Sequence, residues 1–453
     1  MLFVRGTASN ARGGVRGRAA GTRRSSQRSP VVVAGAKRSP QYAAAPVPEA
    51  AASEGSLQAG GKRDRPASTS SVRSRDRSTV AMVGQGTNHE VAKSWDKILR
   101  WGRINMLRKA SDGGGALERC KKVAVLGGGS FGTAVATLLA NNKPEGLEVV
   151  ILMRDEEQAR SITEDHCNSR YLPTHVLPKS VRATTVAADA LEGAEYIVHA
   201  IPVQSSRKFL SRISDLIPPS VPILSLSKGL EIGSNQTMAE LIVEALGREQ
   251  PLAVLSGPTF AVELMAGLPT AIVAASTEPG LTEKVQQLLA SEVLRVNTSN
   301  DVVGVEIAGA LKNVLAIAAG AVVGLDLGNN ALAAVVAQGV AEIRWLACKM
   351  GAKQATMTGL SGVGDIMLTC FVDLSRNRTV GKRLGRGESI EEILASSSQV
   401  AEGVATASSV VELADRYHVA LPVLTAVAKI VDGQLTPREA LELIMGLPQV
   451  AEV

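Results

Sequence analysis

Aromatic residues are scarce in this 453-residue chain, where they make up 3% of the sequence. The hydrophobic fraction of 45% must therefore build aliphatic cores, and the length suits two or three domains. Cysteine is also scarce, and Cys120, Cys167, Cys348 and Cys370 show no metal-ligand spacing. This pattern predicts free thiols in a reducing compartment and no metal site. No apolar run approaches the ~20 residues of a membrane span, so we expect no such span.

Acidic residues are missing from the N-terminal segment. Residues 1–48 contain nine lysines and arginines but no aspartate or glutamate, and they are rich in alanine, serine and glycine. This composition is typical of an organelle transit peptide and lacks the apolar core of a secretory signal. The high serine and alanine content, without a clear arginine-lined helix, favours the chloroplast over the mitochondrion. A cytoplasmic location and a basic RNA-binding tail are the alternatives.

The positive charge is confined to this N-terminal part of the chain. Residues 1–116 hold 21 basic and 7 acidic residues, whereas the remainder holds 28 and 36. The acidic remainder argues against a nucleic-acid partner. We expect a disordered transit peptide over 1–80. A linker over 81–119 follows, partly helical because Trp95, Ile98 and Leu99 share one helical face.

A glycine-rich turn carries the most informative pattern. Four apolar residues run directly into Gly127, Gly129 and Gly132, and an apolar run over 133–139 follows. This is the strand, tight turn and helix of a dinucleotide-binding unit. A side chain at Gly129 would block the approach to a pyrophosphate, which the free N–H groups of the helix would bind. The alternative is an ordinary glycine-rich loop.

Short β-rich runs alternate with helical patterns over 120–300, which predicts an α/β, Rossmann-type, doubly wound sheet. The expected strands are 123–127, 148–153, 181–185, 196–200, 222–226, 252–255, 270–275 and 293–297. Residues 301–450 lack such alternation and predict an all-α domain. Its expected helices are 305–321, 331–350, 404–417 and 422–432.

The second expected strand ends at Arg154 and Asp155. An acidic residue here would bind the ribose diol of NAD, whereas a basic one accepts the 2′-phosphate of NADP. A helix-starting aspartate beside a surface arginine is the third possibility. The sequence therefore leaves the choice between NAD and NADP open.

Six further motifs follow the glycine turn in order, and together they cover the chain to about residue 448. They are Ser227-Lys228-Gly229, Ser256-Gly257-Pro258-Thr259-Phe260-Ala261, Ala310-Leu311-Lys312-Asn313-Val314, Gly362-Val363-Gly364-Asp365 with Thr369-Cys370, Ser375-Arg376-Asn377-Arg378, and Val400-Ala401-Glu402-Gly403-Val404. This ordered set resembles the NAD(P)-dependent sn-glycerol-3-phosphate dehydrogenases of the bacterial and plastid type. The resemblance implies a 6-phosphogluconate-dehydrogenase-like fold.

The resemblance also implies residue roles. Lys312 would be the general base, with Lys228 and Asp365 as catalytic neighbours. The substrate residues would be Lys228, Gly257, Thr259, Asn313, Asp365, Thr369, Ser375, Arg376 and Asn377, with Arg376 and Asn377 at a phosphate. The cofactor residues, the three glycines included, would be Gly127, Gly129, Ser130, Phe131, Gly132, Arg154, Lys228, Ala261, Arg376, Val400 and Glu402. His199 departs from an apolar pattern and is assigned no catalytic role.

The chemistry of hydride transfer to a ketone also requires a proton donor near the carbonyl. The histidines after residue 120 form no evident constellation, whereas Lys312 lies in a largely apolar run. Burial and a second cation such as Lys228 would lower its pKa from about 10.4 toward 7–8, and Asp365 would oppose that shift. A surface lysine at 312, a helix-capping aspartate at 365 and a solvated basic turn over 376–378 are the alternatives.

The expected function is the interconversion of dihydroxyacetone phosphate and sn-glycerol 3-phosphate, which would feed glycerolipid synthesis in a plastid. The alternatives are a related two-domain keto-acid reductase, similar to ketopantoate reductase, and a non-enzymatic dinucleotide-binding protein. We expect a homodimer that acts on a small-molecule substrate.

Overall fold

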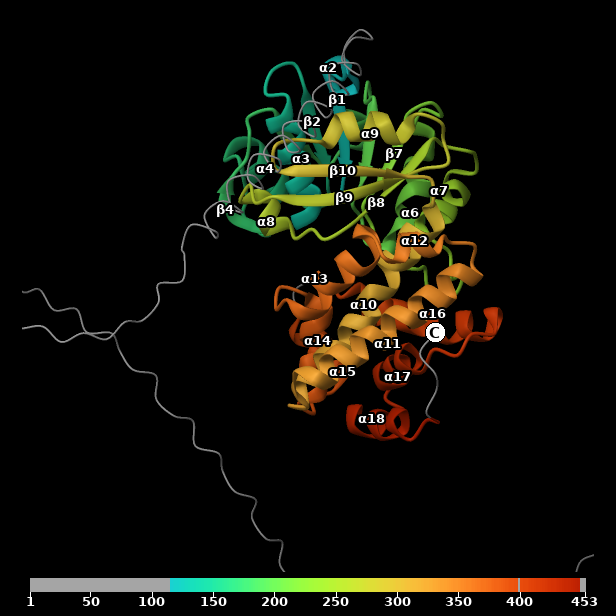
Figure 1. Cartoon of the computed structure of the whole chain (residues 1–453). Helices are drawn as coiled ribbons and strands as arrows, with labels where there is room; N and C mark the ends of the chain where they lie inside the picture. The colour runs from blue at the N-terminus through green and yellow to red at the C-terminus, as the bar shows by residue number, and fades with distance from the viewer. Residues whose placement is uncertain (1–114, 398–399, 449–453) are drawn as a thin grey trace, which may run out of the picture. The chain divides into compact units, whose positions relative to one another are not determined.

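The computed structural model describes residues 115–397 and 400–448, which Figure 1 shows in colour. The predicted transit peptide over 1–80 lies outside these residues. So does the linker over 81–119, apart from residues 115–119, which include α2 (Ala116–Arg119).

The first part of the described chain is built around an eight-stranded sheet with the order β10-β9-β8-β7-β6-β1-β2-β5. Its strands are β1 (Lys122–Leu126), β2 (Glu148–Leu152), β5 (Val181–Thr184), β6 (Tyr196–His199), β7 (Ile223–Ser225), β8 (Leu252–Ser256), β9 (Thr270–Ala275) and β10 (Leu294–Ser299). Each expected strand is present, with both ends within two residues of the prediction. Sheets of this kind are buried on both faces, so their strands read as nearly continuous apolar runs.

Two features of the strands differ from the prediction. β8 and β9 pair antiparallel, whereas the remaining neighbours in the sheet are parallel. A two-stranded antiparallel hairpin of β3 (Cys167–Asn168) and β4 (Leu172–Val176) lies outside the main sheet. β3 has two residues and β4 contains a proline and is mostly exposed, so neither carries a strand pattern.

Helices cover both faces of the sheet (Figure 1). Along β1, Val123 and Val125 join one core while Ala124 and Leu126 join the other. The first core includes α3 (Ser130–Asn142), α8 (Ala261–Met265) and α9 (Leu281–Leu289), and the second includes α5 (Ala187–Leu191), α6 (Val203–Ile213) and α7 (Met238–Leu246). α4 (Glu156–Glu164) follows β2, and the 3₁₀ turn η1 (Ser214–Leu216) follows α6.

The second part is helical and is organised around α10 (Val302–Gly324), which is buried from Gly304 to Val322 apart from Glu306. Around it lie α11 (Gly328–Lys349), α12 (Gln354–Met357), the π-helical turn η2 (Leu360–Gly364), α13 (Asp365–Phe371), α14 (Arg376–Gly385), α15 (Ile390–Ser396), α16 (Glu402–Tyr417), α17 (Pro422–Val431) and α18 (Pro437–Met445). α10, α11, α16 and α17 correspond to the four expected helices. The shorter ones were not predicted.

Small residues allow α10 and α14 to approach closely. A Cβ atom added at Gly381 would lie 1.9 Å from the carbonyl oxygen of Ile317, and one at Gly320 would lie 2.1 Å from that of Arg378. The two helices therefore pack backbone to backbone. This contact fixes the side chains at the start of α14 relative to those on α10.

By length and composition alone, two of the described helices could cross a membrane, α10 and α11; the bent pair Gln354–Phe371 and Arg376–Gly385 also qualifies. The sequence predicted no such span, because Glu306 and Lys312 interrupt the apolar run of α10. In the structure 83% of the most apolar window of α10 is buried, against 39% for α11.

Candidate active site

The glycine turn connects β1 to α3. Gly127 has φ +113°, and a Cβ atom there would lie 2.6 Å from the carbonyl oxygen of Ala200. A Cβ at Gly132 would lie 2.2 Å from the carbonyl of Gly127, so this glycine allows close packing of helix and turn. A Cβ at Gly129 would meet nothing within 4 Å, so this side of the turn is open. α3 begins at Ser130 without a side-chain cap, which leaves its first N–H groups available for an anion.

Three charged side chains form a cluster at the junction of the sheet and the helices, in which Lys312 and Asp365 are buried and Lys228 is partly exposed. Lys312 lies on α10, Asp365 is the first residue of α13, and Lys228 follows β7. Lys312 Nζ lies 2.5 Å from Asp365 Oδ1, and Lys228 Nζ lies 2.7 Å from Asp365 Oδ2. The carboxylate is 1% exposed, so one buried anion is shared by two cations.

Uncharged groups make further hydrogen bonds to these three side chains. The hydroxyl of Thr369, one turn along α13, accepts a hydrogen bond of 2.9 Å from Lys312. The hydroxyl of Ser256 lies 3.4 Å from Asp365 Oδ2, and the carbonyl of Gly257 accepts from Lys228 at 3.2 Å.

The alternatives for these residues are therefore wrong. Lys312 is 7% exposed and is not a surface lysine. Asp365 is not a helix cap, because Gly364 occupies that position and both carboxylate oxygens face lysines.

Burial and the neighbouring charges shift the pKa values of Lys312 and Asp365. Burial lowers the pKa of Lys312 to about 8, with Lys228 acting in the same direction and Asp365 opposing. Burial alone would raise the pKa of Asp365, but the two lysines outweigh it and hold this pKa below its ordinary value. The direction for Lys312 is the one predicted from the apolar run around it.

A second set of polar side chains lies at the start of α14. Asn377 donates to Asn313 Oδ1 at 3.0 Å and accepts from the N–H of Gly403 at 2.9 Å. The hydroxyl of Ser375 caps α14 by accepting from the N–H of Arg378. Arg376 is exposed and donates to the carbonyl of Val400 at 3.1 Å. This segment is therefore the first turn of a helix, not a solvated basic turn.

Glu402 links the helical part to the sheet. Its Oε1 accepts from the N–H of Val203 at the start of α6, at 3.3 Å. Its Oε2 is buried without a hydrogen-bond partner among the described residues, and burial raises the pKa of this carboxyl.

At the end of β2, the structure matches the alternative of a helix-starting aspartate beside a surface arginine. Asp155 caps α4 by accepting from the N–H of Gln158 at 3.1 Å, and Arg154 is exposed. Arg170, on the β3–β4 hairpin, lies 3.7 Å from the other oxygen of Asp155. Arg154 does not join the Lys312 cluster.

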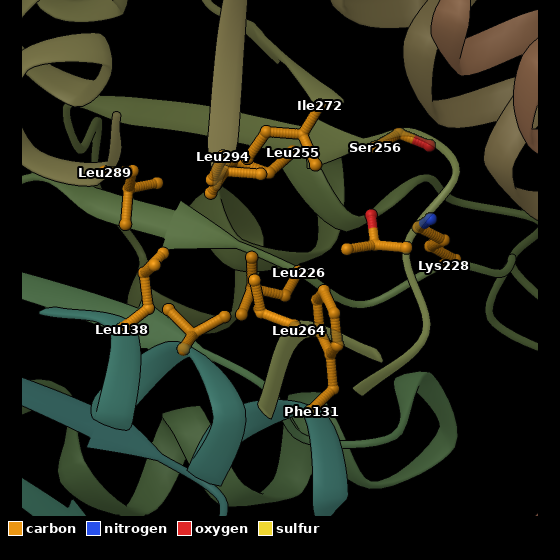
Figure 2. A pocket seen from close by; sticks show the side chains of 12 residues that line it. Phe131, Leu138, Leu226, Lys228, Leu255, Ser256, Leu264, Ile272, Leu289 and Leu294 are labelled. Atoms are coloured by element: carbon orange, nitrogen blue, oxygen red, sulfur yellow. The ribbon is translucent and has the colours of Figure 1, made fainter. Parts of the chain in front are cut away.

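An apolar hollow lies between α3 and the sheet (Figure 2). Figure 2 shows Lys228 and Ser256 at one end and Leu138 and Leu289 at the other, with Phe131 between them. Thr259 also lines it, and Ala261 begins α8 nearby in the chain. The polar end of the hollow therefore coincides with the charged cluster.

Some relevant residues were not assigned from the sequence. Ser256 stood in a quoted motif without a role, although its position at the end of β8 was a usable signal. His199 is a fully buried residue of β6. Its Nδ1 lies 3.2 Å from Ser227 Oγ, while Nε2 has no partner among the described residues. In residues 115–397 and 400–448 no group of three or more metal-ligating side chains is found.

Comparison with known proteins agrees with this geometry. The model of the NAD-dependent glycerol-3-phosphate dehydrogenase N-terminus matches residues 122–282, and that of the C-terminus matches 301–442. The chain is 58% identical over 364 residues to the chloroplastic glycerol-3-phosphate dehydrogenase [NAD(+)] of Oryza sativa, covering 80% of this chain and 82% of the relative. A chloroplastic relative from Arabidopsis thaliana is 59% identical over 361 residues, covering 80% and 85%.

Solved structures give the same result. The crystal structure of glycerol-3-phosphate dehydrogenase from Coxiella burnetii superimposes with a TM-score of 0.69 at 34% identity, covering 72% of this chain and 99% of that one. The family models together match more than half of the chain, and the parts they match are the sheet and the helices that hold the charged cluster. The chain therefore belongs to the NAD-dependent glycerol-3-phosphate dehydrogenases.

Proposed function

We propose that this oxidoreductase interconverts dihydroxyacetone phosphate and sn-glycerol 3-phosphate with Lys312 as the group that exchanges a proton with the substrate oxygen. The observation that supports this role is the buried carboxylate of Asp365, which is shared by Lys312 and Lys228. Asp365 orients the Lys312 amine, and Lys228 supplies the second positive charge. A lysine with a pKa of about 8 is present in both protonation states near neutral pH. It therefore serves as acid in reduction and as base in oxidation.

We assign the phosphate end of the substrate to Arg376 and Asn377. A guanidinium group binds two phosphate oxygens at once, and the N-terminus of α14 adds a favourable dipole. Asn377 uses one N–H on Asn313, which leaves its second N–H for a phosphate oxygen. The remaining substrate contacts are assigned to Lys228, Gly257, Thr259, Asn313, Asp365, Thr369 and Ser375.

We assign the dinucleotide to the glycine turn and to the residues around its open side. The site fits, because Gly129 faces open space and the start of α3 has no side-chain cap. The cofactor residues are Gly127, Gly129, Ser130, Phe131, Gly132, Arg154, Lys228, Ala261, Arg376, Val400 and Glu402. When bound, the nicotinamide supplies the hydride for reduction or accepts it in oxidation. Either NAD or NADP suits this assignment, and no metal ion is required.

We divide the chain into a transit peptide over 1–80, a linker over 81–119, a dinucleotide-binding domain over 120–300 and a helical substrate domain over 301–450. We interpret α10 as a core helix and not a membrane span, because its buried middle carries Lys312 and Asn313. We propose a homodimer, which light scattering of the purified protein tests directly.

The protein is a chloroplast enzyme, as the N-terminal composition predicted and as the names of its rice and Arabidopsis relatives support. Its product, glycerol 3-phosphate, would supply glycerolipid synthesis there. Family membership sets aside the non-enzymatic alternative and the keto-acid reductase.

A direct assay tests the proposed reaction. The purified protein is mixed with dihydroxyacetone phosphate and either NADH or NADPH, and cofactor oxidation is followed at 340 nm. Ketopantoate replaces the substrate in the control, and we expect turnover only with dihydroxyacetone phosphate. Equal rates with ketopantoate would contradict the phosphate assignment.

A further inference from the structure

A second buried polar pair lies directly beneath the glycine turn, apart from the Lys312 cluster. It consists of Gln158 on α4, which is 6% exposed, and Asn168 on β3, which is fully buried. Neither residue belongs to a quoted motif, and no role in the reaction described so far involves them. Amides buried this deeply require hydrogen-bond partners, and those partners indicate what the pair does.

Both side chains donate to the same backbone carbonyl. Asn168 Nδ2 lies 3.1 Å from the carbonyl oxygen of Gly128, and Gln158 Nε2 lies 3.2 Å from it. Asn168 also donates to the hydroxyl of Thr133 at 2.8 Å and accepts from Gln158 at 2.7 Å. The N–H of Tyr171 fills the second acceptor position of Asn168 at 3.2 Å. Asn168 thus makes four hydrogen bonds, which use its full capacity.

The hydrogen bonds to the carbonyl of Gly128 also set the direction of the N–H of Gly129. In a planar trans peptide, the C=O of residue 128 and the N–H of residue 129 point in opposite directions. The two amides hold the carbonyl of Gly128 inward, so the N–H of Gly129 points outward. A Cβ at Gly129 would also meet nothing within 4 Å, and this N–H has no acceptor within residues 115–397 and 400–448.

From this we infer that Gln158 and Asn168 are positioning residues that hold the peptide between Gly128 and Gly129 in the orientation that presents its N–H to the dinucleotide phosphates. Gln158 also links the turn to the end of β2, because its backbone N–H donates to Asp155, which caps α4 there. This inference rests on the proposed function only in that the turn binds the dinucleotide.

The test uses near-isosteric variants of the full-length protein. Asn168→Asp and Gln158→Glu keep the shape of each side chain but replace N–H donors with a carboxylate oxygen facing a carbonyl. The dissociation constant of NADH is measured by fluorescence titration without substrate, and thermal melting reports the fold. We expect the dissociation constant to rise about tenfold in each variant, the effect of losing one hydrogen bond to a buried group. The KM for dihydroxyacetone phosphate should change less than twofold.

Thr137→Val provides the matched control. Thr137 is also buried and lies on the same helix, α3, but its hydroxyl donates to the carbonyl of Thr133 and not to that of Gly128. This variant should bind NADH as the unchanged protein does. If Asn168→Asp does not fold, Gln158→Met removes the second donor at the same carbonyl and carries the test.

Unchanged NADH binding in a variant that melts at a lower temperature would reduce the pair to a structural role and overturn the inference. Failure of the proposed reaction is recognised separately. In that case the unchanged protein would bind NADH but would not reduce dihydroxyacetone phosphate, and the binding comparison would still decide the role of the pair.

Discussion

At the scale of single residues, Lys312 combines burial with two partners of opposite effect, and its removal is the most direct test of the chemistry. Lys312→Ala removes the proton donor but leaves the glycine turn intact. We expect kcat to fall by roughly 10²–10⁴, the usual contribution of general acid–base catalysis. NADH binding should be preserved, as measured by fluorescence titration. A variant that retains near-normal turnover would rule Lys312 out as the proton-transferring group.

The pKa of Lys312 predicts opposite pH profiles for the two directions. Reduction needs the protonated amine, so its rate should fall as pH rises through about 8, whereas oxidation should rise over the same range. Lys228 contributes to the lowered pKa through its charge. In Lys228→Met the midpoint of both profiles should therefore move to higher pH. Profiles of kcat/KM against pH measure this, and an unmoved midpoint would show that the neighbouring cation has no such effect.

We expect Arg154 to affect the KM for NADPH and the KM for NADH differently. Asp155 already accepts a hydrogen bond as the cap of α4, whereas Arg154 is exposed and makes no hydrogen bond or ion pair within the described residues. Arg154→Ala should raise the KM for NADPH more than the KM for NADH, because a 2′-phosphate loses its cationic partner. Steady-state kinetics with both cofactors measures the ratio. Equal effects would place Arg154 away from the 2′ position.

At the scale of elements, the contact of α10 with α14 brings the two halves of the substrate site together. Gly381→Ala places a methyl group against the carbonyl of Ile317, so the helices must separate. We expect a loss of about 1–3 kcal/mol in the free energy of unfolding, measured in urea. Activity should fall as well, because α10 carries Lys312 and α14 carries Asn377.

Gly446→Ala is the control for this helix contact. Gly381 lies inside α14, whereas Gly446 caps the end of α18 with a negative φ, and its added Cβ would lie 3.4 Å from the nearest atom, the carbonyl oxygen of Glu442. Equal losses in both variants would mean that the cost comes from the glycine substitution itself and not from the helix contact.

The elements differ in how far the sequence determines them. The eight main strands were predictable because burial on both faces requires apolar runs. The antiparallel orientation of β9 was not, since the hydrophobic pattern is the same in either direction. The β3–β4 hairpin was missed because it is short, exposed and contains a proline. Its importance comes from Asn168, whose contacts join segments 35 and 40 residues away.

The candidate site, like the elements, was only partly predictable from the sequence. Motif order identified Lys312, Lys228 and Asp365, but only the fold shows that Asp365 faces both lysines and does not cap its helix. The sum of burial and two opposing charges on Lys312 likewise requires three-dimensional neighbours. Residues that act through contacts distant in sequence, such as Gln158, give no local signal.

At the scale of the whole molecule, two ionisable groups, the fully buried His199 and the half-buried Glu306, shape the dependence of stability on pH in opposite directions. Burial lowers the pKa of His199 from 6.5 to about 4 and raises the pKa of Glu306 from 4.5 to about 7. Glu306 lies on α10, and its carboxylate accepts from the N–H of Ala239 on α7, so it links the helical part of the chain to the part built around the sheet. The folded state therefore favours neutral forms of both groups, and the total slope is a difference between their effects.

Comparison with a variant isolates the contribution of His199. Because its folded pKa is below its unfolded pKa, the stability it provides is fully present above pH 6.5 and is lost as pH falls toward 4. Between pH 7 and pH 5 this loss amounts to about 2 kcal/mol. His199→Leu should remove it, so the variant should lose less stability than the unchanged protein on acidification. Urea unfolding at both pH values measures the difference. Parallel losses in the two proteins would mean that His199 is protonated in the folded state despite its burial and its unpartnered Nε2.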